Sequence, residues 1–378
     1  MTTGATGTLA EAYQRLQVTG PEFDGWLSNH GPMAAEAMVR RGYAGNVQRW
    51  LDVYIRRLEE FPRGTVPIGE DWREALGDPR RVADWTGYFR REVTAQPWRA
   101  VLGTWWPRLL PGVAAAATHG VIRVGHAVRA LLEDGDDAVY VTELAHGLAY
   151  WAARWQPIPG AATGYAGEPD RLGSPPAGLG RTPVGIGKAA SSRAAPSAAD
   201  ALAAVPRIAD QSGGVRERLG RLASLPGWPA ALAGPAIPAS PAEIKSRLAG
   251  LADAATIRYL SYGHGNGIML VHSATAPGAV LRTLPALDTS LWAPSLAASW
   301  AAAAALTAVY APAVAAARTG LPGPPAGTQP AEEAFARAVD HGDEHVIKFA
   351  DAALDVFART GNPDALAAVV RAADLIGR

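Results

Sequence analysis

Apolar residues recur every three or four positions along most of this chain, which is the spacing of one face of an α-helix. A representative segment is Gln48–Phe61, where the apolar positions are Trp50, Leu51, Tyr54, Ile55 and Leu58. The same periodicity predicts helices over Leu9–Leu16, Pro32–Arg41, Asp71–Leu76, Val82–Thr94, Trp98–Leu109, Val113–Leu132, Tyr140–Trp155, Ala199–Ile208, Val215–Leu225, Ala242–Tyr259, Leu291–Thr319, Ala331–Val339, Asp343–Arg359 and Pro363–Ile376. The pattern therefore predicts an all-α fold.

Two segments break this periodicity. From Gln156 to about Ala198 the chain is rich in Gly, Pro, Ser and Ala, a composition typical of an irregular loop, a lid or an insertion. The short apolar run Ile268–His272 follows a glycine-rich stretch, and we expect it to be a strand or a buried coil. No tandem repeat is present. The prediction is one large helical domain over residues 1–378, with 156–198 as a Gly/Pro-rich irregular loop or lid insertion.

The composition excludes several classes of function. Lys plus Arg and Asp plus Glu both number 35, so the chain carries no net basic charge with which to attract nucleic acid. The absence of cysteine excludes disulfides, thiolate catalysis and iron–sulfur clusters. Any metal would have to be held by nitrogen and oxygen ligands.

The terminal and apolar segments favour a cytoplasmic protein. Residues Met1 to Gly7 lack the basic segment and apolar core of a secretory signal. The longest apolar stretch, around Ala301 to Ala317, is alanine-rich and contains Pro312, so we expect a buried helix rather than a membrane span. We expect no membrane partner, and nothing in the pattern specifies an oligomeric state.

The residues best suited to chemistry are histidines, which are His30, His119, His126, His146, His264, His272, His341 and His345. His345 and Lys348 are three residues apart near the start of a predicted helix, so their side chains share a face. A lysine beside a histidine suits a metal site if the amine is changed chemically. His272 lies in an apolar run, where an unpaired polar ring costs about 1–3 kcal/mol. His30 directly precedes a predicted helix.

His119 and His126 lie on one predicted helix. Their spacing of seven residues puts them on one face but roughly 10 Å apart along the axis, too far to bind one metal without bending. Either of the two therefore remains a candidate ligand. Gly120 and Gly125 lower the helix propensity of this segment, which indicates that another element packs closely against it.

Two rival metal motifs are weaker. His341, Glu344 and His345 form the inverted zinc-protease pattern His-x-x-Glu-His. Gly342 and Asp343, however, indicate a helix break between the two histidines. A di-iron bundle needs two Glu-x-x-His pairs. Glu143 and His146 form a single such pair in this chain.

Four segments together resemble the questin oxidase-like family, and the likeness extends from about Asn29 to Lys348. They are Asn29-His30-Gly31-Pro32-Met33, Ala117-Thr118-His119-Gly120-Val121-Ile122-Arg123, Leu270-Val271-His272-Ser273 and Gly342-Asp343-Glu344-His345-Val346-Ile347-Lys348. Members of this family include oxygenases that open or rearrange anthraquinone rings in polyketide pathways.

In the iron-dependent branch of that family, four histidines and a carboxylated lysine hold the metal. The resemblance implies that the iron(II) ligands here are His30, His119, His272, His345 and Lys348. Carboxylation requires carbon dioxide and a neutral amine, which burial favours.

The candidate catalytic residues are Arg123 and His126. Arg123 lies one turn beyond His119, where it could bind a phenolate or enolate oxygen, or instead pair with Glu143. His126 is also the main rival of His119 as a ligand. Fungal members carry a tyrosine at the position of His126 and a histidine where this chain has Arg123, which leaves the implied metal ligands in place but bears on substrate identity.

The leading hypothesis is an iron(II)-dependent oxygenase that acts on an aromatic polyketide, an anthraquinone-like quinone or hydroquinone. Dioxygen would be the second substrate, and NADPH is a candidate external reductant, although no Gly-x-Gly-x-x-Gly fingerprint follows a predicted strand. The expected chemistry is ring cleavage or Baeyer–Villiger-type oxygen insertion. The alternatives are a metal-free oxidase of the same substrates and a non-catalytic helical ligand-binding protein.

Overall fold

The structure, a computed structural model, describes residues 3–161 and 196–377. Of the residues that the structure describes, 71% are helical, and one short hairpin, β1 (Glu22–Phe23) and β2 (Leu27–Ser28), forms the sheet in this part of the chain. The α-helices are α1 Thr3–Gln17, α2 Gly31–Arg40, α3 Ala44–Tyr54, α4 Trp72–Ala75, α5 Val82–Ala95, α6 Trp98–Leu109, α7 His119–Asp134, α8 Ala138–Ala153, α9 Ala198–Ala203, α10 Val215–Gly220, α11 Trp228–Ala233, α12 Pro241–Tyr262, α13 Gly267–Thr283, α14 Trp292–Tyr310, α15 Pro330–His341, α16 Glu344–Thr360 and α17 Asp364–Leu375. The predicted all-α fold is confirmed.

Short 3₁₀ segments connect or extend these helices. They are Ile55–Arg57, Pro79–Arg81, Leu110–Gly112, Ala115–Thr118, Arg221–Ser224, Gly263–Gly265, Leu284–Ala286, Thr289–Leu291 and Arg318–Gly320. Several helices begin where a polar side chain accepts a hydrogen bond from the first turn. Asn266 caps α13, Ser240 caps α12 and Asp343 caps α16, because each oxygen satisfies an amide that lacks an intrahelical partner.

The structure corrects three local predictions. The helix expected over Val113–Leu132 begins only at His119, because the residues before it turn left-handed. The run Ile268–His272 lies in α13, not in a strand or coil. The helix expected over Leu291–Thr319 ends at Tyr310, since Pro312 cannot continue it.

Two further differences concern the middle of the chain. The short helix α11 was not predicted, because Gly and Pro flank it and it is too short to show periodicity. Most of the segment 156–198, expected to be irregular, lies outside the described residues, and its last residue begins α9. The single-domain prediction and the lid interpretation stay predictions.

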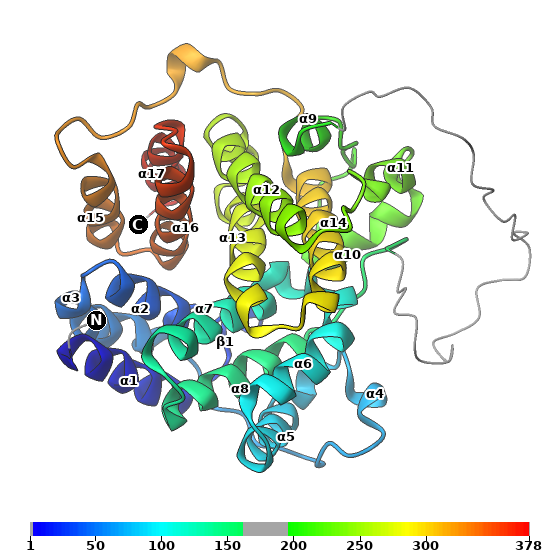
Figure 1. Cartoon of the computed structure of the whole chain (residues 1–378), viewed down its shortest axis with the longest axis vertical. Helices are drawn as coiled ribbons and strands as arrows, with labels where there is room; N and C mark the ends of the chain where they lie inside the picture. The colour runs from blue at the N-terminus through cyan, green and yellow to red at the C-terminus, as the bar shows by residue number, and fades with distance from the viewer. Residues whose placement is uncertain (1–2, 162–195, 378) are drawn as a thin grey trace, which may run out of the picture.

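Four helices form a ring at the centre of the fold. Helix α2 packs on α7 and α16, and α13 packs on the same two helices. Figure 1 shows α13 upright between α16 and α14, with α7 running across behind it. Buried hydrophobic side chains extend through all of these helices as one core cluster, so the ring lies well inside the molecule.

Glycines allow α7 to approach its neighbours closely. A Cβ on Gly120 would lie 2.5 Å from Trp151 Cβ of α8, and one on Gly125 would lie 2.6 Å from Ala279 Cβ of α13. Both contacts are shorter than side-chain atoms tolerate. The expected close packing at these two positions is confirmed.

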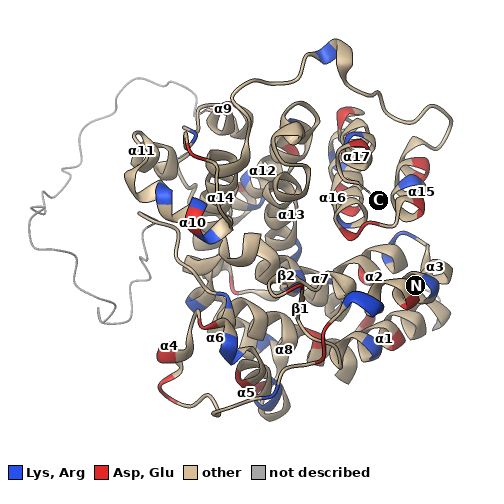
Figure 2. Ribbon diagram, turned by 180° about the vertical axis from the view of Figure 1, so that it is seen from behind, with Lys and Arg blue, Asp and Glu red and all other residues tan. Residues whose placement is uncertain are grey.

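Helix α14 belongs to the core. The stretch Thr289–Tyr310 is long and apolar enough to cross a membrane, but 72% of its 18-residue apolar window is buried inside the structure. The buried helix predicted around Ala301–Ala317 is confirmed as far as Tyr310, and residues 312–317 lie outside the helix and are partly or fully exposed. Figure 2 shows acidic and basic residues interspersed over the helices rather than gathered by sign on one face.

Candidate metal centre

Four histidines from distant parts of the sequence meet at the helix ring. Nε2 of His119 lies 2.6 Å from Nε2 of His30 and 2.9 Å from Nε2 of His272. The ring of His345 is centred 4.3 Å from that of His30 and 5.5 Å from that of His272. One nitrogen from each of the four rings lies within 4.8 Å of all the others.

The helix starts position these rings. His30 is the N-cap of α2, His119 is the first residue of α7, and His345 is the second residue of α16. Helix N-termini carry partial positive charge, which disfavours a protonated imidazole there. Burial, followed by the charge of Lys348, lowers the pKa of His30, His119 and His272 well below the usual value. These three rings are therefore neutral at physiological pH.

Lys348 completes the cluster, one helical turn after His345. Its side chain is buried, with Nζ 3.4 Å from Nε2 of His272. Burial lowers the pKa of its amine to about 7, so a large fraction is neutral at neutral pH. Within the described part of the chain it forms no ion pair. The sequence has only three lysines, which are Lys188, Lys245 and Lys348, and the rarity of lysine in so arginine-rich a chain is a signal that sequence reasoning could have used.

Outer contacts fix how two of the rings face the centre. The carbonyl of Ala116 accepts a short hydrogen bond from Nδ1 of His119. A carboxylate oxygen of Asp343 lies 3.3 Å from Nδ1 of His345. With Nδ1 occupied as a donor, the Nε2 lone pair of each ring is free for the centre.

An unusual turn places the Ala116 carbonyl. Ala116, Ala117 and Thr118 have φ angles of 46°, 53° and 69°, a left-handed conformation that costs L-residues roughly 1–2 kcal/mol each. Such strain persists only where surrounding packing imposes it. No sequence signal marks it, because an alanine run predicts a helix.

The nitrogen set fits a divalent metal ion. Nδ1 of His30 has no hydrogen-bond partner among the described residues, and three Nε2 atoms face one another at contact distance. Neutral imidazoles cannot all donate to each other, so their lone pairs lie crowded unless a cation accepts them. Imidazole donors suit iron, zinc, copper and nickel.

Sequence reasoning missed the residues that support the centre from outside. The backbone N–H of His30 donates to the hydroxyl of Tyr54 over 2.6 Å. Glu344 Oε1 lies 3.9 Å from Nδ1 of His30, and the other carboxylate oxygen pairs with Arg57. Tyr54 had appeared only as one apolar position of a helical face, and no local pattern distinguishes it.

The two candidate catalytic residues lie outside this group of four. Arg123 is buried and forms a two-point ion pair with Glu143, including Nη2 to Oε2 at 2.9 Å. Nδ1 of His126 lies 2.7 Å from a carboxylate oxygen of Glu36. Of the rival ligands, the structure therefore brings His119 and not His126 to the centre. The catalytic roles of Arg123 and His126 stay predictions, and both side chains are already bonded to carboxylates, those of Glu143 and Glu36.

The other histidines have separate surroundings. His146 is buried, and its Nε2 has no hydrogen-bond partner among the described residues. Nε2 of His341 lies 3.0 Å from the carbonyl of Ile376, and His264 is exposed. A helix break does separate His341 from His345, as expected, since Gly342 has φ 84°. His341 and His345 therefore do not share one face of a single helix, as the inverted zinc-protease pattern would require.

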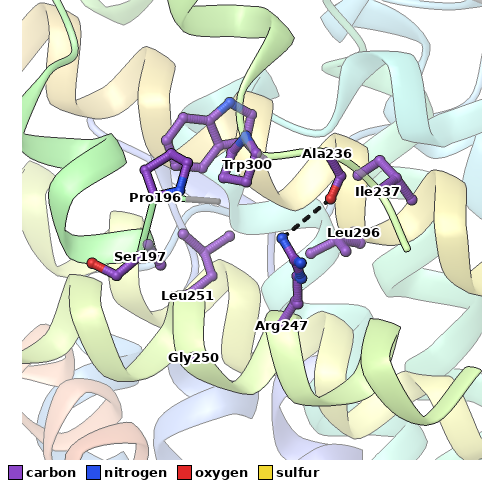
Figure 3. Close-up of a pocket in the computed structure, with 11 residues that line it drawn as sticks. Pro196, Ser197, Ala236, Ile237, Arg247, Gly250, Leu251, Leu296 and Trp300 are labelled. Carbon is purple, nitrogen blue, oxygen red and sulfur yellow. Dashed lines mark hydrogen bonds between the residues drawn. The ribbon is translucent and has the colours of Figure 1, made fainter. Parts of the chain in front are cut away.

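Two of the surface cavities among the described residues differ in their relation to the centre. One, of about 510 Å³, borders the outer side of the centre; its lining includes Trp50, Tyr54, Arg57, Asp343 and Glu344. The other, of about 310 Å³, lies between α9, α12 and α14. Figure 3 shows Trp300, Leu251 and Arg247 around it, and it shares no lining residue with the centre.

Comparison with known proteins identifies the chain's relationships. The family model described as questin oxidase-like matches residues 33–353. This range contains His119, His272, His345 and Lys348 and begins three residues after His30. No curated protein matches the chain.

Proposed function

The chain belongs to the questin oxidase-like family, which indicates an oxidoreductase acting on polyketide-type substrates, and on this premise we propose that it is a non-haem iron(II)-dependent oxygenase. The proposed substrate is an aromatic polyketide, an anthraquinone-like quinone or hydroquinone, and the second substrate is dioxygen. The proposed outcome is ring cleavage or Baeyer–Villiger-type oxygen insertion. NADPH is the proposed external reductant.

One observation carries this proposal, namely the convergence of four imidazoles and one lysine in the core. The nitrogens of His30, His119, His272 and His345 lie within 4.8 Å of one another, with Lys348 against His272. A structural role alone does not favour this arrangement, because buried polar groups normally occur with complementary partners. Here donors of the same kind face each other.

Lys348 would supply the anionic ligand. Its neutral amine attacks carbon dioxide, forming a nitrogen–carbon bond and releasing one proton, which leaves a carbamate oxygen anion on the side chain. Four neutral imidazoles and one anion would hold iron(II) with a single net positive charge. Iron(II) held there would supply electrons to dioxygen and so make it reactive.

The remaining residues hold these donors in place. Ala116 and Asp343 keep the Nδ1 atoms of two rings engaged. Tyr54 fixes the backbone at His30, so the ring enters the centre from a rigid helix start. Second-sphere partners of this kind typically change metal affinity 10–100-fold.

The test is elemental analysis of protein purified without oxygen, combined with oxygen uptake on an anthraquinone with NADPH. The wild type should hold one iron per chain, and His345→Ala should lose both iron and oxygen uptake. His341→Ala is the matched control, because it removes a neighbouring histidine that faces Ile376, and it should retain both. A His345→Ala protein that keeps its iron and its activity would remove the proposal.

A further inference from the structure

A second buried polar cluster occupies the same ring of helices. Its centre is Arg129 of α7, which joins Glu36 of α2 to Asp351 of α16. Nε of Arg129 donates to Glu36 Oε1 over 2.7 Å, and Nη2 donates to Asp351 Oδ2 over 3.0 Å. Both carboxylates are completely buried.

The cluster includes residues from all four helices of the ring. From α13, Nη2 of Arg282 donates to Asp351 over 2.6 Å and to Asp355 over 2.7 Å. Arg41, at the end of α2, donates to Asp351 over 2.7 Å. We name the set of Glu36, Arg41, His126, Arg129, Arg282, Asp351 and Asp355 the ion network.

The ion network is not itself a metal site. Glu36, His126 and Asp351 lie close enough to share a cation, but the guanidinium of Arg129 already bonds to both carboxylates. The three arginines of the network balance its three carboxylates, and Arg40 also pairs with Glu36, so no surplus negative charge is left to attract a cation. The arginines lower the pKa of Asp351 well below its usual value despite burial, which keeps these pairs ionised.

Each helix of the network also carries one of the histidines of the centre. Along their helices, Glu36 follows His30 by six residues and Arg282 follows His272 by ten. At 1.5 Å per residue, the network therefore lies roughly 9–15 Å from the centre along the helix axes. Helices α2, α7 and α16 begin at the centre, and α13 passes it in its second turn, so a shift of one helix along its axis moves its ligand directly.

Apolar packing alone fixes that shift weakly. Hydrophobic contact is non-directional, and small residues such as Gly125 and Ala279 lie where α7 and α13 approach each other closely. Arginine–carboxylate pairs have a fixed two-point geometry. A network that joins all four helices therefore sets their axial positions together.

We propose that Glu36, Arg129 and Asp351 are positioning residues for the metal centre, holding the four ligand-bearing helices in the register at which their histidines converge. This inference rests on the proposed function, because it assigns the ion network a role in metal binding. It concerns geometry and requires no contact between the network and the ion.

The experiment titrates metal-free protein with cobalt(II), whose visible absorption reports coordination geometry, for wild type, Asp351→Asn and Glu36→Gln. Both variants keep side-chain size and lose the charge. We expect cobalt affinity to fall about 10-fold, with a changed absorption spectrum. Leu102→Ala is the control for general destabilisation, because Leu102 is a buried residue of α6, and it should bind cobalt as the wild type does.

The outcomes separate this inference from the proposed function. Wild-type protein that binds no cobalt contradicts the proposed function itself. Wild-type binding together with unchanged affinity and spectrum in folded Asp351→Asn and Glu36→Gln would overturn the positioning role, whatever their stability. If these two do not fold, Arg282→Lys, which changes the α13 member of the network, decides in the same way, since lysine keeps the charge but not the two-point geometry.

Discussion

Lys348 is a buried amine among imidazoles, with no ion-pair partner in the part of the chain that the structure describes. An ordinary surface lysine extends its stem along the protein and keeps its ammonium in water. Lys348 is 1% exposed, so the metal-free protein bears a desolvation cost at this position. Residues that reduce stability in this way concentrate at functional sites.

Replacing this lysine should separate stability from metal binding. Lys348→Met keeps the length of the side chain and removes the buried amine, so metal-free protein should become more stable by about 1–3 kcal/mol, while metal affinity should collapse. Urea unfolding and metal titration measure the two effects. Lys245→Met, at an exposed position, should change neither. Loss of stability with retained metal binding would contradict the assignment of Lys348.

His146 should make the protein sensitive to acid. Burial, assisted by Arg123 and Arg90, lowers its pKa to about 3. The unfolded chain binds this proton near pH 6.5, so stability is complete above that pH and is lost as the pH falls toward 3. Between pH 8 and pH 5, the stability of His146→Gln relative to wild type should rise by about 2 kcal/mol.

Chemical unfolding at the two pH values measures this change. His264→Gln, which alters an exposed histidine, should show no such dependence. A difference between His146→Gln and wild type that stays constant with pH would mean that His146 is not held neutral in the folded protein.

At the scale of elements, the left-handed turn before α7 is the feature that most affects the centre. The turn directly precedes the first residue of α7, and it brings the Ala116 carbonyl to Nδ1 of His119. Three successive non-glycine residues with positive φ are uncommon. The packing of α7 against α8 and α13 must compensate for their strain.

Glycine should relax this turn. Ala117→Gly removes the steric cost of positive φ and should stabilise the fold by about 1 kcal/mol, whereas glycine normally destabilises a right-handed helix by a similar amount. Thermal unfolding shows whether the glycine raises or lowers the stability of the fold. Ala130→Gly, inside α7, provides the matched control and should destabilise. A destabilised Ala117→Gly protein would contradict the left-handed turn.

The periodicity of apolar residues predicted helices well where the residues also have high helix propensity. Helix α6 has the predicted bounds, Trp98–Leu109. Helix α13 was missed because Pro277 and Gly278 lie inside it. Its stability comes from burial against α7, α12 and α14, and tertiary packing of this kind overrides propensity.

For the candidate site, sequence reasoning succeeded for residues that lie close together on one helix. His345 and Lys348 do lie one turn apart on α16. The convergence of His30, His119 and His272 depends on contacts between helices far apart in the sequence, which no local period encodes. Their ligand set came from the family resemblance, and the ion network could not be predicted at all.

At the scale of the whole molecule, the fold acts as a frame around one polar centre. The ring of α2, α7, α13 and α16 brings the four histidine side chains together at one height along the helix axes. At a second height it brings the arginines and carboxylates of the ion network together. The surrounding helices bury the four histidines, Glu36 and Asp351, and the side chain of Asp355 is 33% exposed at the edge of the network. In the absence of a metal, crowded imidazoles should oppose the packing that the ion network favours.

Metal binding should therefore stabilise the fold. An ion that binds only the folded state, at 100 times its dissociation constant, adds about 2.7 kcal/mol. Iron(II) added without oxygen should raise the unfolding midpoint, and a chelator should reverse the rise. His272→Ala protein should show no such rise, and an equal rise in that variant would place the binding site elsewhere.

The most direct measurement is a crystal structure of the iron-loaded protein with anomalous diffraction recorded at the iron edge. We predict one anomalous peak per chain, bounded by His30, His119, His272, His345 and Lys348, with additional density for a carbamate on the lysine. Iron-loaded crystals with no peak among these residues, or with a peak at Glu36 and Asp351 instead, would contradict the account.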